Sequence, residues 1–444
     1  MGAPLLRQPF TILILIFLSA AVGLLLGDYV YTNQRFPSNT FIENLDVSGL
    51  KVSEVILQLE GADVDATSLK FITLLSSTEG YEYAPSEIGA YIKPRTSAYE
   101  AFKSSYESSY FKGILRRVLG ERRQLVLPLQ LGLDEDKTKS VLKEVAKGID
   151  APSLEAHCIL LGGGRYRLTK EKLGKGVGID ETITLLRDAF ANGKRTAPLI
   201  VKVVPPRILK RNLVSRPPVR SIARYQTQYG YHDSENRIHN IKLMSSVLNN
   251  YIILSGETFS LLDVIGEISE KEGYKEAMVI VGGELVPQYG GGTCQVATTL
   301  YNAAMLADLE IVQRKNHAIY FFIYPLGRDA AIYPGSLDLK FKNNTGHPIM
   351  LRLYVTDKDL TFAIYGTPAG KSVEFSSPKI IVKKAGLFSY EVSQEAFGFD
   401  APFSTVVKRA VSIGDKVIKE EKIKSYYKYA GEGNARVVRQ ELEE

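Results

Sequence analysis

An internal repeat constrains the fold of this chain more than any other feature of its sequence. Residues 86–102 (SEIGAYIKPRTSAYEAF) and residues 171–190 (EKLGKGVGIDETITLLRDAF) share one pattern: a glycine turn, a short extended piece and then a helix. A further strand-turn-helix piece precedes each copy. The repeat therefore predicts two related α/β modules, over residues 41–120 and 121–207.

The helix of the second copy carries an apolar face at helical spacing. Ile183, Leu186, Ala189 and Phe190 recur every three or four residues, as on one side of an α-helix. Asp180 lies just ahead of this face, where an acidic side chain can cap a helix. We therefore expect the helix to pack into a core rather than to carry a site.

The N-terminus predicts export from the cytoplasm. Residues 10–27 are apolar, uncharged and about long enough to span a bilayer, with Arg7 before them and Asp28 after them. We predict a single-pass transmembrane helix within residues 1–35, a cytoplasmic tail and an extracytoplasmic remainder. A cleaved signal peptide is the alternative, although the small residues 19–21 lie inside an apolar run that continues beyond them.

Composition narrows the partners and the number of domains. A chain of 444 residues exceeds what one hydrophobic core usually organises. Its net charge of +6 suits anionic envelope polymers or lipid head groups, but the basic residues are spread along the chain, so nucleic-acid binding is not predicted.

The two cysteines, Cys158 and Cys294, form no CxxC pair or His/Cys cluster, so neither a metal site nor a cofactor is predicted.

The segment from Gly290 to Gln295 (GGGTCQ) is the strongest candidate for chemistry. Its glycines permit positive φ angles and lead into a helix predicted over residues 293–306, with Cys294 in the first turn. The helix dipole and free N–H groups favour a thiolate at that position. Backbone groups at Gly291 and Gly292, helped by the Gln295 amide, could hold an oxyanion beside the sulfur.

A base for this cysteine is predicted downstream. His317 follows a strand-like segment, residues 309–314, that returns from the helix, and Asp329 follows a second predicted strand over residues 318–324. The order Cys294, His317, Asp329 suits acyl transfer or amide hydrolysis, with the aspartate orienting the imidazole. The alternative is that Cys294 is a small buried residue at a glycine-rich turn. A Cys-Gln thioester is disfavoured because adjacent residues are poorly placed to bond.

Other polar residues near this segment are candidates for substrate binding. Arg237, Asn240 and Arg328, together with Arg314, could meet a carboxylate or a phosphate of a wall polymer. Each arginine has an alternative as the partner of an acidic side chain, for example Arg328 with Asp338.

A long series of motifs in this half of the chain resembles the VanW family. Their order and spacing hold over roughly 120 residues. They are Arg237, Asn240 and Ile241; residues 256–260 (GETFS); Gly266; residues 273–274 (GY); residues 290–304 (GGGTCQVATTLYNAA); residues 310–314 (EIVQR); His317; residues 324–330 (YPLGRDA); and residues 338–345 (DLKFKNNT). The resemblance implies an accessory role in cell-wall maintenance or in the response to glycopeptides.

The second repeat module also resembles a known domain. Residues 131–206 are similar to the peptidoglycan-binding domain that commonly precedes VanW regions, which implies non-catalytic attachment to cell-wall polymer. Because the chain has no Trp, sugar stacking would fall to tyrosines such as Tyr91, Tyr99, Tyr106 and Tyr110. Ordinary surface or core tyrosines are the alternative.

The sequence therefore predicts an α+β protein with an N-terminal transmembrane helix. The duplicated modules would be followed by a Pro-rich connector over residues 208–222, a VanW-like domain over 223–369 and a β-rich tail over 370–444. Three functions are open. The first is a membrane-anchored protein that binds peptidoglycan without chemistry, and the second is a cysteine-dependent enzyme acting on wall peptide through Cys294 and His317. The third, suggested by the β-rich tail, is a structural envelope protein that binds other proteins, whose identity the sequence does not indicate.

Overall fold

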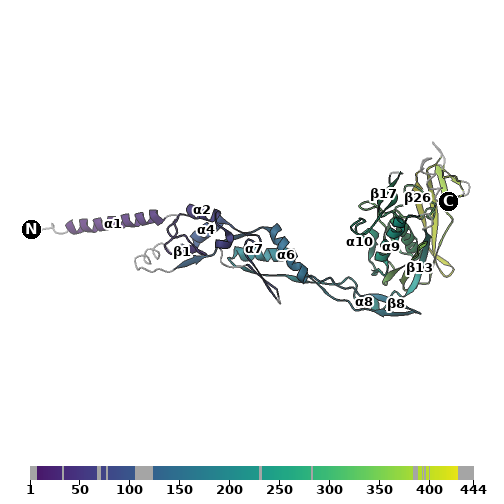
Figure 1. Ribbon diagram of the computed structural model, residues 1–444, viewed down its shortest axis with the longest axis horizontal. Helices are drawn as coiled ribbons and strands as arrows, with labels where there is room; N and C mark the ends of the chain where they lie inside the picture. Colours follow the sequence, from purple (N-terminus) through teal and green to yellow (C-terminus); the bar gives the residue numbers. More distant parts are fainter. Residues whose placement is uncertain are drawn as a thin grey trace, which may run out of the picture. The chain divides into compact units, whose positions relative to one another are not determined.

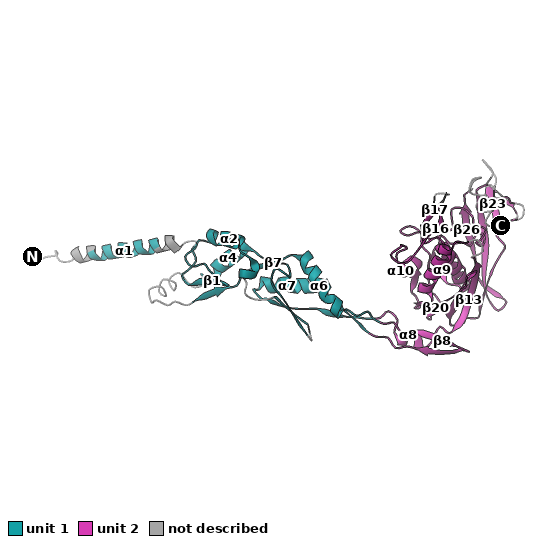
Figure 2. Ribbon diagram, viewed as in Figure 1, with its two compact units in different colours: residues 1–153, 173–205 teal, residues 154–172, 206–444 magenta. Residues whose placement is uncertain are grey.

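The computed structural model describes residues 8–32, 35–67, 72–76, 79–105, 124–229, 233–281, 284–383, 389–392, 394, 397–399 and 401–428. The chain divides into two compact units, which Figure 2 colours separately. Unit 1 comprises residues 1–153 and 173–205, and unit 2 comprises residues 154–172 and 206–444. Tyr106 and Tyr110, two of the candidate stacking residues, lie outside the described residues.

The N-terminal segment is helical, as α1 (Gln8–Thr32), but the predicted transmembrane anchor is wrong. Among the residues that the structure describes, no helix is both long enough and apolar enough to cross a membrane.

Unit 1 alternates short strands with helices, as the repeat predicts (Figure 1). Its further elements are β1 (Thr40–Ile42), β2 (Leu45–Asp46), α2 (Val52–Glu60), α3 (Val64–Thr67), β3 (Ile72–Leu75), β4 (Gly80–Tyr83), β5 (Ala90–Ile92), α4 (Pro94–Ser105), β6 (Leu125–Leu127), β7 (Leu131–Leu133), α6 (Glu135–Ile149), β10 (Gly174–Val177), α7 (Ile179–Ala191), β11 (Thr196–Pro198) and β12 (Val201–Val204). In each copy a strand after the glycine turn leads directly into a helix, β5 into α4 and β10 into α7.

The helices of unit 1 follow their sequence signals with one correction. The predicted apolar face of α7 is buried, including Leu186 and Phe190. Asp180 is not the N-cap of α7, because the helix begins two residues earlier than that role requires: Gly178 is the N-cap and Asp180 lies in the first turn. Its negative charge there still complements the positive end of the helix dipole.

Strands from the two halves of unit 1 pair with one another. β1 pairs in parallel with β6, β3 in parallel with β11, and β5 antiparallel with β7. One hydrophobic cluster extends from Phe36 to Leu199 and takes side chains from both halves. The boundary between modules at residues 120 and 121 stays a prediction.

Unit 2 contains the cysteine motif within a mixed α/β arrangement (Figure 1). Its elements are β8 (Cys158–Gly162), β9 (Arg165–Leu168), α8 (Lys210–Val214), β13 (Arg220–Gln228), α9 (Glu235–Leu248), β14 (Ile252–Ile253), β15 (Thr258–Ser260), α10 (Leu261–Ile265), β16 (Glu276–Val281), β17 (Glu284–Tyr289), α11 (Thr293–Leu306), β18 (Glu310–Gln313), β19 (Lys340–Lys342), β20 (Ile349–Val355), β21 (Asp359–Gly366), β22 (Lys371–Phe375), β23 (Lys379–Lys383), β24 (Ser389–Val392), β25 (Phe403–Ile413) and β26 (Lys416–Tyr427).

Helix α11 is the central element of unit 2. It packs against β13 and β21 of an antiparallel sheet with the order β13-β21-β20-β14, and against α9. Val296, Leu300, Ala303 and Ala304 are completely buried in the main hydrophobic cluster. The small alanines let neighbouring backbones approach, so the helix that carries Cys294 is held rigidly.

The tail forms antiparallel strands, as its alternating pattern predicts. β25 pairs with β22, β23 and β26, and Gly414 and Asp415 make the turn from β25 to β26. The strand predicted over residues 318–324 is wrong, because that segment forms turns. Its aromatic side chains explain the misleading pattern: Tyr320 packs into a separate cluster with Phe403 and Tyr427 rather than into a sheet face.

Candidate functional site

Cys294 lies where the sequence predicts it, in the first turn of α11. The helix begins at Thr293 after Gly292, which adopts a left-handed conformation with φ of 104°. The thiol faces the Ile332 carbonyl, with its sulfur 3.6 Å from the oxygen. Cys294 is half-buried, whereas Cys158 is buried among apolar side chains of another cluster, and both thiols are free.

The glycines before the helix are required by close packing. A Cβ on Gly291 would lie 2.7–2.8 Å from atoms of Ala277, including its backbone. A Cβ on Gly292 would approach Arg237 and Ile241 to 3.0 Å, at a φ that disfavours any side chain. The turn therefore brings the start of α11 directly against α9 and β16.

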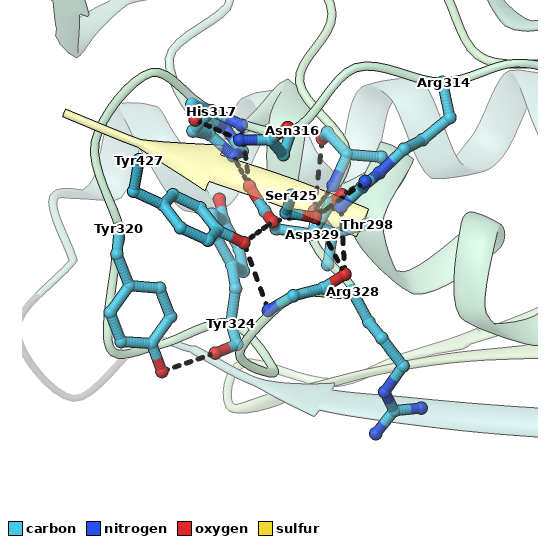
Figure 3. Close-up of polar contacts among 12 residues, drawn as sticks. Thr298, Arg314, Asn316, His317, Tyr320, Tyr324, Arg328, Asp329, Ser425 and Tyr427 are labelled. Atoms are coloured by element: carbon cyan, nitrogen blue, oxygen red, sulfur yellow. Dashed lines mark hydrogen bonds and ion pairs between the residues drawn. The ribbon is translucent and has the colours of Figure 1, made fainter. Parts of the chain in front are cut away.

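His317 and Asp329 form a tight pair beside this helix (Figure 3). The carboxylate oxygen Oδ2 of Asp329 is 2.6 Å from His317 Nδ1 and also accepts the His317 backbone N–H at 2.7 Å. Both side chains are largely buried, with 12% exposure for His317 and 2% for Asp329. The aspartate thus holds both the backbone and the ring of His317 in place.

The second carboxylate oxygen of Asp329 is held by two other donors. Tyr427 donates its hydroxyl to Oδ1 at 2.6 Å, and Arg314 donates from Nη2 at 3.2 Å. Although burial raises the pKa of Asp329, the hydrogen bond and charge of His317, with Arg314 and Tyr427, outweigh it and lower that pKa. The carboxylate is therefore charged at neutral pH.

The electrostatics couple Cys294 to His317. Burial raises the pKa of the Cys294 thiol, but a hydrogen bond to His317 and the charge of that ring outweigh it, so the pKa is lowered. Burial lowers the pKa of His317, yet hydrogen bonds to Asp329 and Cys294 raise it to about 9. His317 is therefore an imidazolium at neutral pH, and its charge favours the thiolate form of Cys294, which is the reactive form of a cysteine nucleophile.

Aromatic rings fix the orientation of the imidazole. Tyr324 stacks on His317 with ring centroids 5.1 Å apart and planes 18° from parallel. Phe321 meets the ring edge-on at 5.1 Å. Because Tyr324 is buried beside Cys294, its own pKa is raised and its hydroxyl stays neutral. The ring of His317 is thus held by Asp329 at one edge and by Tyr324 on one face.

Arg237 and Gln295 lie near the thiol but are engaged with protein groups. Arg237 pairs with Asp233 at 2.6 Å and donates to Gln295 Oε1 at 3.3 Å. The Gln295 amide in turn donates to the Gln228 carbonyl at 3.3 Å and is completely buried. The positive charge of Arg237 also lowers the pKa of Cys294. These contacts leave Arg237 an electrostatic role, while the oxygen and the nitrogen of the Gln295 amide are each hydrogen-bonded to a protein group.

The side chains of Cys294, His317 and Asp329 are called the reactive cluster below. Asn240 and Arg328 are hydrogen-bonded to groups outside it. The Asn240 amide donates to the carbonyls of Lys275 and Gly291, at 2.8 and 3.0 Å, and so ties α9 to the glycine turn. Arg328 donates to Asn302 at 3.0 Å and stacks on Phe375, and Figure 3 shows its guanidinium pointing away from Asp329. Both residues support the site from outside.

Backbone N–H groups remain as candidates for an oxyanion hole. Thr293 and Gln295 donate back to Gly290 and Gly292, which closes the first turn. Within the part of the chain that the structure describes, the N–H groups of Gly292 and Cys294 have no protein acceptor. Free N–H groups at a helix start are suited to hold negative charge.

Several residues of the site were not predicted from the sequence. Tyr324, Ser425 and Tyr427 contact His317, Arg314 and Asp329. The motif around Tyr324 was visible, but nothing in the alternating pattern of the tail marks Ser425 or Tyr427. Among the described residues, no group of three or more His, Cys, Asp or Glu side chains is arranged to hold a metal ion.

Comparisons with known proteins agree with the predicted resemblances. Residues 236–365 match the family model described as "VanW like protein", and residues 81–198 match the one described as "Putative peptidoglycan binding domain". The predicted resemblance to both families is confirmed, but the peptidoglycan-binding match begins at residue 81 and so includes part of the first module, whereas the resemblance was predicted over residues 131–206. The strand β26, which supplies Ser425 and Tyr427, lies outside both matches.

Two known proteins are similar in sequence to part of this chain. "Uncharacterized protein YoaR" of Bacillus subtilis (strain 168) is 39% identical over 133 residues, covering 30% of this chain and 44% of the relative. "Vancomycin B-type resistance protein VanW" of Enterococcus faecalis (strain ATCC 700802 / V583) is 29% identical over 164 residues, covering 35% of this chain and 60% of the relative. The chain thus spans less than two thirds of either relative. No solved structure matches it.

Proposed function

We propose that this chain, which carries a VanW-like domain, is a cell-wall protein that binds peptidoglycan and transfers or hydrolyses acyl groups of wall peptides through Cys294. One observation carries the enzymatic part. His317 is hydrogen-bonded to Asp329 beside the start of α11, and the imidazole and the Cys294 thiol shift each other's pKa, which is lowered at the thiol and raised at the imidazole. A purely structural cysteine has no need of this arrangement.

The first step is attack on an amide of the wall peptide. The Cys294 thiolate adds to the carbonyl carbon, and the negative charge that develops on the oxygen is stabilised by N–H groups at the helix start. Collapse of this intermediate breaks the C–N bond. The His317 imidazolium gives its proton to the departing amine, which leaves an acyl thioester on Cys294 and a neutral imidazole.

The second step releases the acyl group. Neutral His317 takes a proton from water or from an incoming amine as that nucleophile attacks the thioester carbonyl. The C–S bond breaks, and Cys294 leaves as thiolate beside the regenerated imidazolium. Water as nucleophile yields hydrolysis, and an amine of another wall peptide yields a new cross-link. No oxidant, metal or cofactor enters either step.

Attachment to the wall is assigned to unit 1. The match of residues 81–198 to a peptidoglycan-binding model supports this assignment. Tyr99, on α4, is 60% exposed and suits stacking on sugar rings, whereas one face of Tyr91 lies against Gly132. A wall substrate implies an extracytoplasmic location and a role in cell-wall maintenance or in the response to glycopeptides.

Purified protein incubated with soluble peptide fragments of peptidoglycan tests the proposal. Mass spectrometry of the products should show cleaved or newly joined stem peptides with the wild-type chain, and no such products with Cys294→Ser. The intact mass of the wild-type protein should also show an acyl adduct on Cys294 before turnover is complete.

Cys158→Ser is the matched control, because Cys158 is a buried thiol far from the site in sequence and has a pKa raised by burial. It should keep full activity. A folded wild-type chain that forms neither products nor an adduct, or a Cys294→Ser chain as active as wild type, refutes the enzymatic part.

A further inference from the structure

The C-terminal strand β26 reaches the site from outside the region that matches the VanW-like model. The last residues of this strand, Ser425 to Tyr427, meet the segment 314–329 through several hydrogen bonds (Figure 3). Arg314 donates to Ser425 Oγ at 2.9 Å, and the Asn316 amide donates to the Tyr426 carbonyl at 2.7 Å. The tail is therefore joined to the same segment that carries His317 and Asp329.

Tyr427 makes the most direct of these contacts. It is completely buried, and its hydroxyl donates to Asp329 Oδ1 at 2.6 Å while accepting the Gly327 N–H at 3.1 Å. The distance to Asp329 is in the range of a charge-assisted hydrogen bond. Tyr427 thus touches the carboxylate on the oxygen opposite to the one that holds His317.

We propose that Tyr427 is a positioning residue of the reactive cluster, which makes the C-terminal β-module a necessary part of the site. Its hydroxyl and Arg314 hold Oδ1 of Asp329, so that Oδ2 stays in the plane of the imidazole and on its Nδ1. This inference rests on the proposed function of Cys294 and His317, and it names a contributor from another part of the chain.

The contact acts through the orientation of Asp329. A carboxylate rotates about one bond, and two donors on each oxygen fix that rotation. Phenylalanine at position 427 would keep the ring packed against Tyr320 and Phe403 but remove one donor from Oδ1. It would also leave the Gly327 N–H without its acceptor, which loosens the turn that bears Asp329. His317 would then stabilise the Cys294 thiolate less well.

The full-length chain with Tyr427→Phe tests this role, in a Cys158→Ser background so that one thiol is measured. The readout is the rate of alkylation by iodoacetamide as a function of pH. We expect the profile to move by about one pH unit toward alkaline values, with about tenfold slower alkylation near pH 6. Tyr426→Phe is the control, because the Tyr426 side chain is 55% exposed, and its profile should equal wild type.

A double-mutant cycle with Asp329→Asn separates positioning from a general loss of structure. If Tyr427 acts through Asp329, adding Tyr427→Phe to Asp329→Asn produces no further shift of the profile. Circular dichroism and thermal melting establish that each variant is folded. An unchanged profile in folded Tyr427→Phe, a shift toward acidic values, or full additivity in the cycle overturns the inference.

The thiol profile is measured without a wall substrate, so it is distinct from the test of the proposed function. A wild-type chain that shows no turnover while Tyr427→Phe shifts its thiol profile sinks the enzymatic proposal and leaves the positioning role standing. If the wild-type chain turns over wall peptide and the Tyr427→Phe profile is unshifted, the enzymatic proposal stands and the positioning role of Tyr427 is refuted.

Discussion

At the scale of single residues, the coupling of Cys294 to His317 sets the pH range expected for the proposed reaction. The pKa of the thiol is lowered mainly by the hydrogen bond to His317 and by its charge, against the effect of burial. The pKa of His317 is raised to about 9 by Asp329 and Cys294, again against burial. The thiolate and the imidazolium therefore stabilise each other, and the two groups titrate as a pair.

The pH dependence of turnover is predicted to be bell-shaped. Activity should rise as the thiol ionises, below the usual thiol pKa near 9, and fall through about pH 9 as His317 loses the proton that the leaving amine needs. Initial rates of peptide release between pH 5 and 10 check this.

The variant His317→Ala moves the ascending limb, which reports the thiol, toward alkaline pH and removes the descending limb, which reports the imidazole. Alkylation of Cys294 near pH 6 should become at least about tenfold slower, because the thiol returns toward its ordinary pKa. The rate of iodoacetamide modification measures this in the Cys158→Ser background. Coincident profiles for wild type and His317→Ala would show that the imidazole does not activate the sulfur.

At the scale of elements, helix α11 is positioned at both ends by packed neighbours. Its start is brought against β16 by Gly291, and its last turn is held by Arg409 from β25. The chemistry of the site depends on these distant contacts, because a displacement of the helix moves the sulfur with it.

Gly291→Ala should destabilise unit 2 by about 1–3 kcal/mol, the usual cost of overpacking a rigid interior. The added methyl group would meet backbone atoms of Ala277 at 2.8 Å, and backbone cannot yield as a flexible side chain can. Urea unfolding followed by circular dichroism measures the loss. Gly148→Ala, in α6 of unit 1, is the control because its new methyl group meets no atom within 4 Å; a similar loss in both variants would argue against the clash.

Arg409→Met tests the other end of α11. The guanidinium is fully buried, donates twice to the Met305 carbonyl, at 3.0 and 2.7 Å, and pairs with Asp308 and Glu421 at 2.8 and 2.6 Å. Its removal leaves buried acceptors without a donor. We expect a loss of about 3 kcal/mol, at the lower end of the range for breaking a buried ion pair, because Lys371 still pairs with Asp308.

Lys408, the exposed neighbour of Arg409, provides the control for Arg409→Met. Lys408→Met removes a positive charge from the same strand without touching α11, so it should change the free energy of unfolding by less than about 0.5 kcal/mol. Equal losses in Arg409→Met and Lys408→Met would mean that net charge, rather than the clamp on α11, accounts for the effect.

At the scale of the whole molecule, wall binding and thiol chemistry are assigned to different compact units, each with its own hydrophobic cluster. We predict that the two functions can be separated by point variants. Cys294→Ser should sediment with insoluble peptidoglycan as wild type does. Tyr99→Ala, on α4, should reduce the bound fraction by about two- to tenfold, as expected for one lost aromatic contact, and leave the alkylation profile of Cys294 unchanged.

Tyr166→Ala is the control for the sedimentation assay, because Tyr166 is an exposed tyrosine on β9 of unit 2. It should bind peptidoglycan normally. If Tyr99→Ala binds as well as wild type and Tyr166→Ala does not, the assignment of wall binding to unit 1 is wrong.

Local sequence signals were sufficient for much of the architecture. The glycine turn and the apolar spacing after it predicted α11 at its observed bounds, and the turn at Gly414 and Asp415 was correctly placed between strands. Three local predictions failed, including the helix cap at Asp180, which lies inside the first turn of α7. The segment 318–324 has the residues of a strand but forms turns, and the apolar N-terminal segment does not contain a described helix that could cross a membrane.

The sequence by itself determined which residues start α11 and which residue types were available for chemistry, because helix starts and glycine turns depend on neighbours along the chain. Only the tertiary structure decided that His317 is coupled to Cys294 and hydrogen-bonded to Asp329. It also decided that the Arg328 guanidinium points away from Asp329, and that Tyr427 reaches Asp329 from 98 residues downstream. Those contacts depend on how sheets and loops pack in three dimensions, and residue order does not encode that packing locally.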